Sequence, residues 1–143
     1  MKIAIGADNA GFEYKEVIKK FLESTNYDVI DKGTWSADSV DYPDFAHAVA
    51  KEVENKNADF GILLCGSANG VAITANKHPK VRAAICWQNE IASLSRKHND
   101  ANVICIPARF VSIDSAKEMI ETFLHTDFEA GRHEKRKEKI DIC

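Results

Sequence analysis

Short apolar runs alternate with segments of helical spacing along the chain, and this alternation limits the fold more than any other feature. We expect strands at residues 3–6, 27–30, 60–64, 82–86 and 102–106. Apolar runs separated by helices are typical of βαβ units and a parallel sheet. The pattern therefore predicts an α/β protein with a single doubly wound, Rossmann-like five-stranded parallel sheet and helices on both faces.

The segments between these runs carry apolar residues three and four positions apart, which predicts helices that pack on the sheet. The expected buried stripes are Tyr14, Val17, Ile18, Phe21 and Leu22; Phe45, Ala48, Val49 and Val53; and Ala116, Met119, Ile120, Phe123 and Leu124. The second helix should begin near Asp41, because Asp before Pro43 is a helix start signal. Further helices are expected at 71–77, from Asn89 through Leu94, and in the charged C-terminal segment 131–140.

Length and charge narrow the function classes. The chain has 143 residues, and no linker or repeat marks a boundary, so we expect one domain over residues 1–143. Its 19 Lys and Arg against 22 Asp and Glu give a net charge of −3, which argues against nucleic acid as a partner. No apolar run is long enough for a membrane span and no signal segment is evident, so we expect a cytoplasmic protein without a membrane partner.

Four cysteines are present, and no two have the spacing of a redox or zinc pair. Cys86 and Cys105 lie in apolar runs and are expected to be small buried hydrophobic residues. Cys65 differs, because it follows an apolar strand and precedes the loop Gly66, Ser67, Ala68, Asn69 and Gly70. Backbone N–H groups of such a loop can bind an anion and favour a thiolate, so Cys65 is a candidate base or nucleophile, with a buried structural thiol as the alternative.

Polar residues at other segment ends are candidates for the same site. Asp8 follows the first strand in a loop that matches neither common nucleotide-binding motif, and it is either a turn residue or catalytic. His98, flanked by Asn99, lies in an expected helix–strand connection and is either solvated or a proton donor. Arg109 follows the last strand. Arg132 and Arg136 are one helical turn apart, which suits a phosphate or carboxylate, or a solvated basic face.

Several motifs in order resemble the type B ribose-5-phosphate isomerases and their allose-6-phosphate and galactose-6-phosphate relatives. They are IGADNAGFEYK, DKGTWS, VDYPDFA, GILLCGSANG, TANKHP with VRAAIC one residue later, SRKHNDANV and GRHEKR, and the likeness runs from Ile3 to Ile140. The resemblance implies interconversion of ribose 5-phosphate and ribulose 5-phosphate through an enediolate, without metal or organic cofactor. It also implies a homodimer or homotetramer with sites between subunits.

The resemblance further implies roles for individual residues. Cys65 would be the base and His98 the proton donor. Gly66, Ser67, Ala68, Asn69 and Gly70 would form the anion hole. Asp8 and Asn99 would hold sugar hydroxyls, Tyr42 would line the pocket, and Arg109, Arg132 and Arg136 would bind the phosphate end.

Three positions depart from the family pattern. Asn9 stands where His is usual near the phosphate, and an amide cannot carry a positive charge. Ala68 and Ala130 stand where Gly is common, and Ala68 would alter the loop or narrow the space beside the sugar. These departures motivate two alternatives: an isomerase of a hexose 6-phosphate, or a sugar-phosphate-binding homologue with reduced turnover.

Overall fold

The computed structural model describes residues 1–141, and Cys143 lies outside this range. Five parallel strands form one sheet in the order β2-β1-β3-β5-β4. Their bounds are β1 Lys2–Ala7, β2 Asp28–Asp31, β3 Phe60–Cys65, β4 Ala83–Ile85 and β5 Val103–Pro107. Each predicted strand is present with ends shifted by one residue or so, and the expected doubly wound α/β fold is confirmed.

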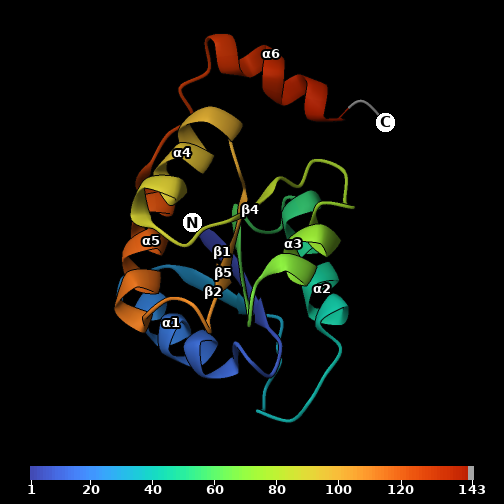
Figure 1. The fold of residues 1–143 in the computed structure, drawn as a ribbon, viewed down its shortest axis with the longest axis vertical. Coiled ribbons are helices and arrows are strands. Elements are labelled where there is room, and N and C mark those ends of the chain that lie inside the picture. Colours follow the sequence, from blue (N-terminus) through green and yellow to red (C-terminus); the bar gives the residue numbers. More distant parts are fainter. Residues whose placement is uncertain (142–143) are drawn as a thin grey trace.

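Helices cover both faces of this sheet (Figure 1). Those on one face are α1 Phe12–Ser24, α4 Asn89–Asn99 and α5 Ile113–His125, and those on the other are α2 Tyr42–Glu54 and α3 Asn69–Ala75. Each face has its own apolar core. Phe123 and Ile18 belong to the first, while Val49 and Val71 belong to the second. Cys86 and Cys105 are fully buried, as expected.

The first helix departs from its expected stripe. Val17 is 41% exposed, whereas Lys15 is completely buried on the face that packs against the sheet. The Lys15 ammonium lies 2.8 Å from a carboxylate oxygen of Asp31 at the end of β2. A lysine can take a core position when a carboxylate compensates its charge, so the expectation of a buried Val17 was wrong.

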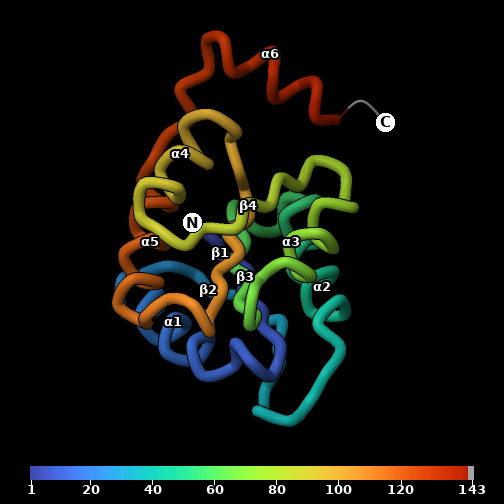
Figure 2. Tube along the Cα trace, viewed as in Figure 1, coloured from blue at the N-terminus to red at the C-terminus, as the bar shows by residue number. Residues whose placement is uncertain are grey.

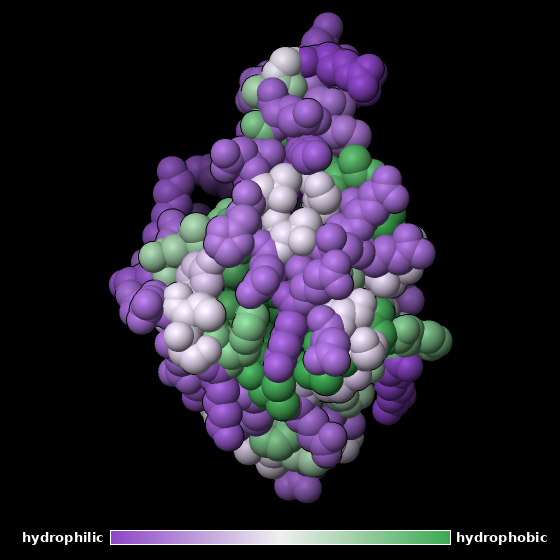
Figure 3. All heavy atoms as spheres, turned by 90° about the vertical axis from the view of Figure 1, so that its left-hand side faces the viewer, coloured by the Kyte–Doolittle hydropathy of each residue, from purple (hydrophilic) through white to green (hydrophobic). Residues whose placement is uncertain are grey.

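The charged C-terminal segment forms α6 Arg132–Glu138 and a 3₁₀ turn, Lys139–Asp141. It crosses one end of the molecule, above α4, and remains apart from the sheet (Figure 2). In the space-filling view this end is mostly hydrophilic (Figure 3). Among the described residues, no helix is long and apolar enough to cross a membrane.

Candidate active site

The carboxyl ends of three adjacent strands bring Asp8, Cys65 and Arg109 together. The strands β1, β3 and β5 are neighbours in the sheet, and Cys65 is in register with Pro107. The backbone N–H of Asp8 donates to Leu64 O, and that of Arg109 donates to Gly66 O. The chain order reverses between β1 and β3, where open α/β sheets commonly bind ligands.

Cys65 and Asp8 are in direct contact. The Cys65 Sγ atom donates a hydrogen bond to Asp8 Oδ2 over 2.9 Å, while Asp8 Oδ1 accepts the backbone N–H of Gly11. Asp8 therefore acts both as a turn residue and as the partner of the thiol. Burial, with the hydrogen bond and negative charge of Asp8, raises the pKa of Cys65 to about 12.

The loop after Cys65 opposes this shift only in part. Hydrogen bonds from the backbone N–H groups of Gly66 and Ala68 lower the thiol pKa, as the loop pattern suggested. Burial and Asp8 outweigh them, because both penalise the charged form of the thiol. The loop N–H groups therefore favour the thiolate as expected, but burial and Asp8 keep the thiol pKa above its ordinary value.

Two side chains flank the loop. Gly66 lies against the side chain of Arg109, because a Cβ added at Gly66 would lie 3.4 Å from the guanidinium nitrogen Nη1. Gly70 lies so close to the ring of Tyr42 that a Cβ there would overlap the ring. Tyr42 is the first residue of α2, so the start of this helix packs directly against the loop.

The structure shows what surrounds Ala68 and Asn9, two of the positions that depart from the family pattern. Ala68 has φ +67°, in the left-handed region that favours glycine, and its methyl group is fully buried in the core under α2 and α3. The methyl group therefore does not occupy exposed space beside the loop. The side-chain oxygen of Asn9 accepts the backbone N–H of Val40 over 3.4 Å, which joins the two loops at this edge.

A pocket of about 400 Å³ adjoins the loop. Its lining residues are Ser67, Asn69, Ile85, Trp87, Pro107 and Phe110. Trp87 is 51% exposed and Phe110 is 75% exposed. An uncovered aromatic rim beside a polar loop is typical of a surface that receives another molecule.

The remaining candidates gather around α4 and α6. His98 lies in the last turn of α4, not in a connection as expected, and its ring stacks on His133 with centroids 4.3 Å apart. His98 Nε2 is 3.7 Å from a Glu129 carboxylate oxygen. Desolvation, with the neighbouring His98 and Arg132, holds the pKa of His133 below its ordinary value.

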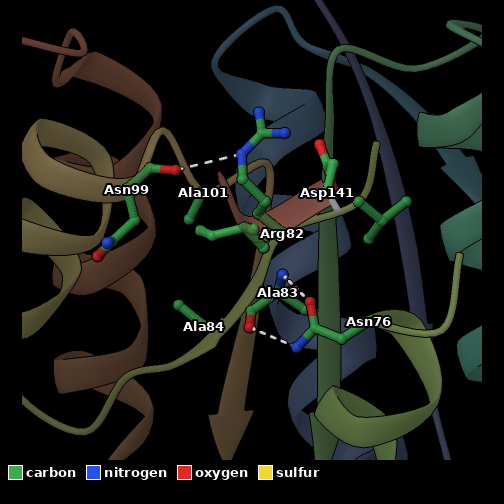
Figure 4. A pocket seen from close by; sticks show the side chains of 9 residues that line it. Asn76, Arg82, Ala83, Ala84, Asn99, Ala101 and Asp141 are labelled. Atoms are coloured by element: carbon green, nitrogen blue, oxygen red, sulfur yellow. Dashed lines mark hydrogen bonds between the residues drawn. The ribbon is translucent and has the colours of Figure 1, made fainter. Parts of the chain in front are cut away.

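The rest of this second group is exposed. Asn99 ends α4, and Arg132 and Arg136 project to solvent from α6. Asp100 fixes α4 against α6, because its carboxylate accepts from Arg96 and from Lys137. Asn99 also borders the pocket of about 330 Å³ in Figure 4, where its carbonyl oxygen accepts from the Arg82 Nε–H.

The group around Cys65 and the group around His98 lie at opposite ends of the strands. Cys65 stands at the carboxyl end of β3, whereas the α4 C-terminus leads into the amino end of β5. A five-residue strand spans about 16 Å, so one chain cannot place His98 beside Cys65. The expected residues therefore form two separate groups rather than one cluster. The pocket in Figure 4 belongs to the edge remote from Cys65.

Comparison with known proteins identifies the family. The family model described as Ribose/Galactose Isomerase matches residues 3–140, almost the whole chain. The chain belongs to this isomerase family. Ribose-5-phosphate isomerase B of Escherichia coli is 43% identical over 139 residues, covering 97% of this chain and 93% of that protein.

Solved structures of family members superpose on this isomerase-family chain over nearly its full length. The ribose 5-phosphate isomerase from Thermotoga maritima has a TM-score of 0.97 and 46% identity, covering 99% of this chain and 98% of the other. Ribose-5-phosphate isomerase B from Mycoplasma genitalium, crystallised with bound ribulose-5-phosphate, has a TM-score of 0.94 and 40% identity. It covers 97% of this chain and 93% of the other. The family resemblance and the fold are thereby confirmed.

Sequence reasoning missed one supporting pair in this family member. Asp31 binds Lys15 through both carboxylate oxygens and also accepts the Gly33 backbone N–H. Gly33 O in turn accepts the backbone N–H of Ala7, directly before Asp8. The pair thus fixes the segment beside the candidate site. The sequence did carry a signal for this pair. Lys15 lies three residues before Ile18, a spacing that places it on the same buried face of the helix.

Proposed function

We propose that this chain is an aldose–ketose isomerase that interconverts ribose 5-phosphate and ribulose 5-phosphate. The observation that carries the proposal is the Cys65 thiol, hydrogen-bonded to Asp8 at the switch point of the sheet. An acceptor beside a buried thiol, next to a loop of N–H donors, suits proton transfer at carbon. The names of the ribose-5-phosphate isomerase B relatives support this reaction.

The reaction begins with loss of the thiol proton. Asp8 Oδ2 is the acceptor at 2.9 Å through which Cys65 becomes a thiolate. The thiolate then takes the proton from C2 of the open-chain aldose, which leaves an enediolate and regenerates the thiol. Return of that proton to C1, with transfer of the hydroxyl proton from O2 to O1, gives the ketose, and Asp8 then returns its proton to the Cys65 thiolate. The proposal invokes no metal or organic cofactor.

Charge that develops on the enediolate oxygens would be stabilised by the loop after Cys65. Backbone N–H groups of residues 66–70 would donate to the oxyanion, and the Ser67 hydroxyl and Asn69 amide line the adjoining pocket. Donors held in place before the reaction stabilise the transition state without reorganisation. Asp8, Asn9 and Tyr42 border the same edge and would contact the sugar.

A second copy of the chain would complete this site. The second group lies at the opposite end of the strands from Cys65 and consists of His98, Asn99, Arg132 and Arg136. A homodimer or homotetramer would bring this group of one copy beside the Cys65 group of another. The exposed Trp87 and Phe110 beside the Cys65 loop support an interface there. In this assembly His98 would donate the proton for ring opening, and the paired arginines, with Arg109, would bind the phosphate.

The whole chain would serve this one activity as a single domain. The test is kcat/KM for purified protein with a panel of pentose and hexose phosphates, in the presence of a chelator. We expect ribose 5-phosphate and ribulose 5-phosphate to be the preferred pair, and Cys65→Ala to lose nearly all turnover. Preference for a hexose 6-phosphate would replace the substrate assignment. An unchanged rate in Cys65→Ala would overturn the assignment of the base.

A further inference from the structure

Two histidines and a glutamate meet on the α2–α3 face, away from the residues assigned to the reaction. His47 lies on α2, and His78 lies in the segment after α3. His47 Nδ1 is 2.6 Å from His78 Nε2, and His78 Nδ1 is 2.9 Å from a carboxylate oxygen of Glu54. The two rings are tilted by 59° with centroids 4.9 Å apart.

The glutamate fixes the tautomer of His78. A carboxylate only accepts hydrogen bonds, so the Nδ1–H of His78 donates to Glu54. In the neutral ring this leaves a lone pair on Nε2, directed at His47 Nδ1. A carboxylate behind one imidazole nitrogen, with the other nitrogen free to ligate, is the usual second shell of a histidine metal ligand.

We propose that His47 Nδ1 and His78 Nε2 bind a divalent transition-metal ion, with Glu54 orienting His78 from behind. A metal at about 2.0–2.1 Å from each nitrogen would replace the hydrogen bond between the two rings, and the nitrogens would move from 2.6 Å to about 3 Å apart. In the bound form the neutral His47 ring carries its proton on Nε2. Water completes the coordination. Imidazole ligands suit nickel, zinc and copper better than magnesium or calcium.

The surroundings give such an ion access and room for its water ligands. A pocket of about 410 Å³ adjoins His78, and Glu54 is partly exposed. Lys77 and Lys80 also line this pocket, and the carboxylate of Glu54 offsets part of their repulsion of a cation. The bound metal would tie α2 to the segment after α3, and so stabilise the helix pair that carries Tyr42 and the Cys65 loop.

A second histidine cluster provides the comparison. His98, Glu129 and His133 offer ligand atoms within 4.8 Å of one another. The rings of His98 and His133, however, are stacked with an interplanar angle of 15°. Because imidazole lone pairs lie in the ring plane, two stacked parallel rings do not direct them at one point. In His47 and His78, by contrast, the two ring nitrogens face each other over 2.6 Å, so a small rotation of the tilted rings would turn both toward one ion.

The experiment is calorimetric titration of the metal-free full-length protein with Ni²⁺ and then with Co²⁺, at a pH where imidazole is neutral. We expect one Ni²⁺ per chain, bound more tightly than Co²⁺, with a rise in Tm that a chelator reverses. His47→Gln should abolish this binding, because its amide can still donate to His78 but does not ligate. Glu54→Gln should weaken the affinity by about 10–100-fold.

His125→Gln is the matched control, because His125 is exposed and lies outside both clusters. It should bind Ni²⁺ as the unmodified protein does. Equal binding by His47→Gln would overturn the proposal, as would the absence of any binding by the unmodified protein. Loss of binding in His133→Gln but not in His47→Gln would assign the ion to the stacked cluster and would also overturn it. Each variant's Tm in chelator reports whether it folds.

Discussion

The Sγ atom of Cys65 donates a 2.9 Å hydrogen bond to Oδ2 of Asp8 between two neighbouring strands. Burial and this partner raise the thiol pKa to about 12, so the thiol is protonated at neutral pH. In the proposed reaction the same contact would supply the acceptor for the thiol proton. Asp8 thus suppresses general thiol reactivity while it enables the proposed proton transfer.

Asp8→Asn should separate these two effects. Removing the negative charge lowers the Cys65 pKa, so alkylation by iodoacetamide at neutral pH should accelerate by about tenfold per unit of pKa. Isomerase turnover should fall by about 10²–10⁴-fold, because the amide is a poor proton acceptor. Cys65→Ser identifies the alkylated residue. Unchanged alkylation in Asp8→Asn would contradict the role assigned to the carboxylate.

Lys15→Met should destabilise the fold strongly. It removes the buried partner of Asp31 and leaves a carboxylate with 11% side-chain exposure only the partly exposed Lys19 as an ionic partner. The expected loss in the free energy of unfolding is about 3–5 kcal/mol, measured by urea denaturation. Lys19→Met is the control, since Lys19 is a third exposed and 3.3 Å from the same carboxylate. Its loss should stay below about 1 kcal/mol. Similar losses in both variants would refute the importance of burial.

The Lys15–Asp31 pair also predicts a pH dependence. Burial alone would raise the pKa of Asp31, but hydrogen bonds from Lys15 and the Gly33 N–H outweigh it and hold that pKa below its usual value. A carboxyl group with a depressed folded-state pKa stabilises the fold above its unfolded pKa and loses this contribution as the pH falls. Stability should therefore decline below about pH 4, and less steeply in Lys15→Met. Parallel pH profiles would contradict this assignment.

The sequence predicted the strands well because their apolar runs are short, and those of the central strands β1, β3 and β5 are largely buried. It failed at Lys15, since the pairing that lets a lysine enter the core comes from Asp31 on another element. It placed Cys65 and Asp8 at strand ends, but their contact depends on β1 and β3 being neighbours. It could not place His98 relative to Cys65, because that requires knowing where α4 ends along the sheet.

Asn9→His should raise the affinity for phosphorylated substrate if position 9 contacts the phosphate. The side chain already lies at the Cys65 edge, where its oxygen accepts from the Val40 N–H. A protonated imidazole adds a charge-assisted hydrogen bond worth about 1.5–3 kcal/mol, which corresponds to roughly a 10–100-fold lower KM. Steady-state kinetics at mildly acidic pH measure this change. An unchanged KM would remove position 9 from the phosphate site.

Arg136→Gln should weaken substrate binding more than it slows the chemical step. The guanidinium is exposed on α6, far from Cys65 within one chain, and is assigned to the phosphate of a site shared with a second copy. Loss of a charged hydrogen bond should raise KM by about 10–100-fold. Lys135→Gln, on the same exposed helix, is the matched control and should leave KM unchanged. Equal effects of the two substitutions would indicate a general charge effect.

Subunit complementation tests most directly whether Cys65 and His98 act together from different copies. Cys65→Ala and His98→Gln chains, each nearly inactive alone, are mixed in equal amounts, dissociated and reassembled, with two affinity tags to verify mixed assemblies. If each site takes Cys65 from one chain and His98 from another, random pairing leaves about a quarter of the sites intact and restores about a quarter of the unmodified activity. If both residues act within one chain, no intact site can form. Verified mixed assemblies without restored activity would contradict the shared site.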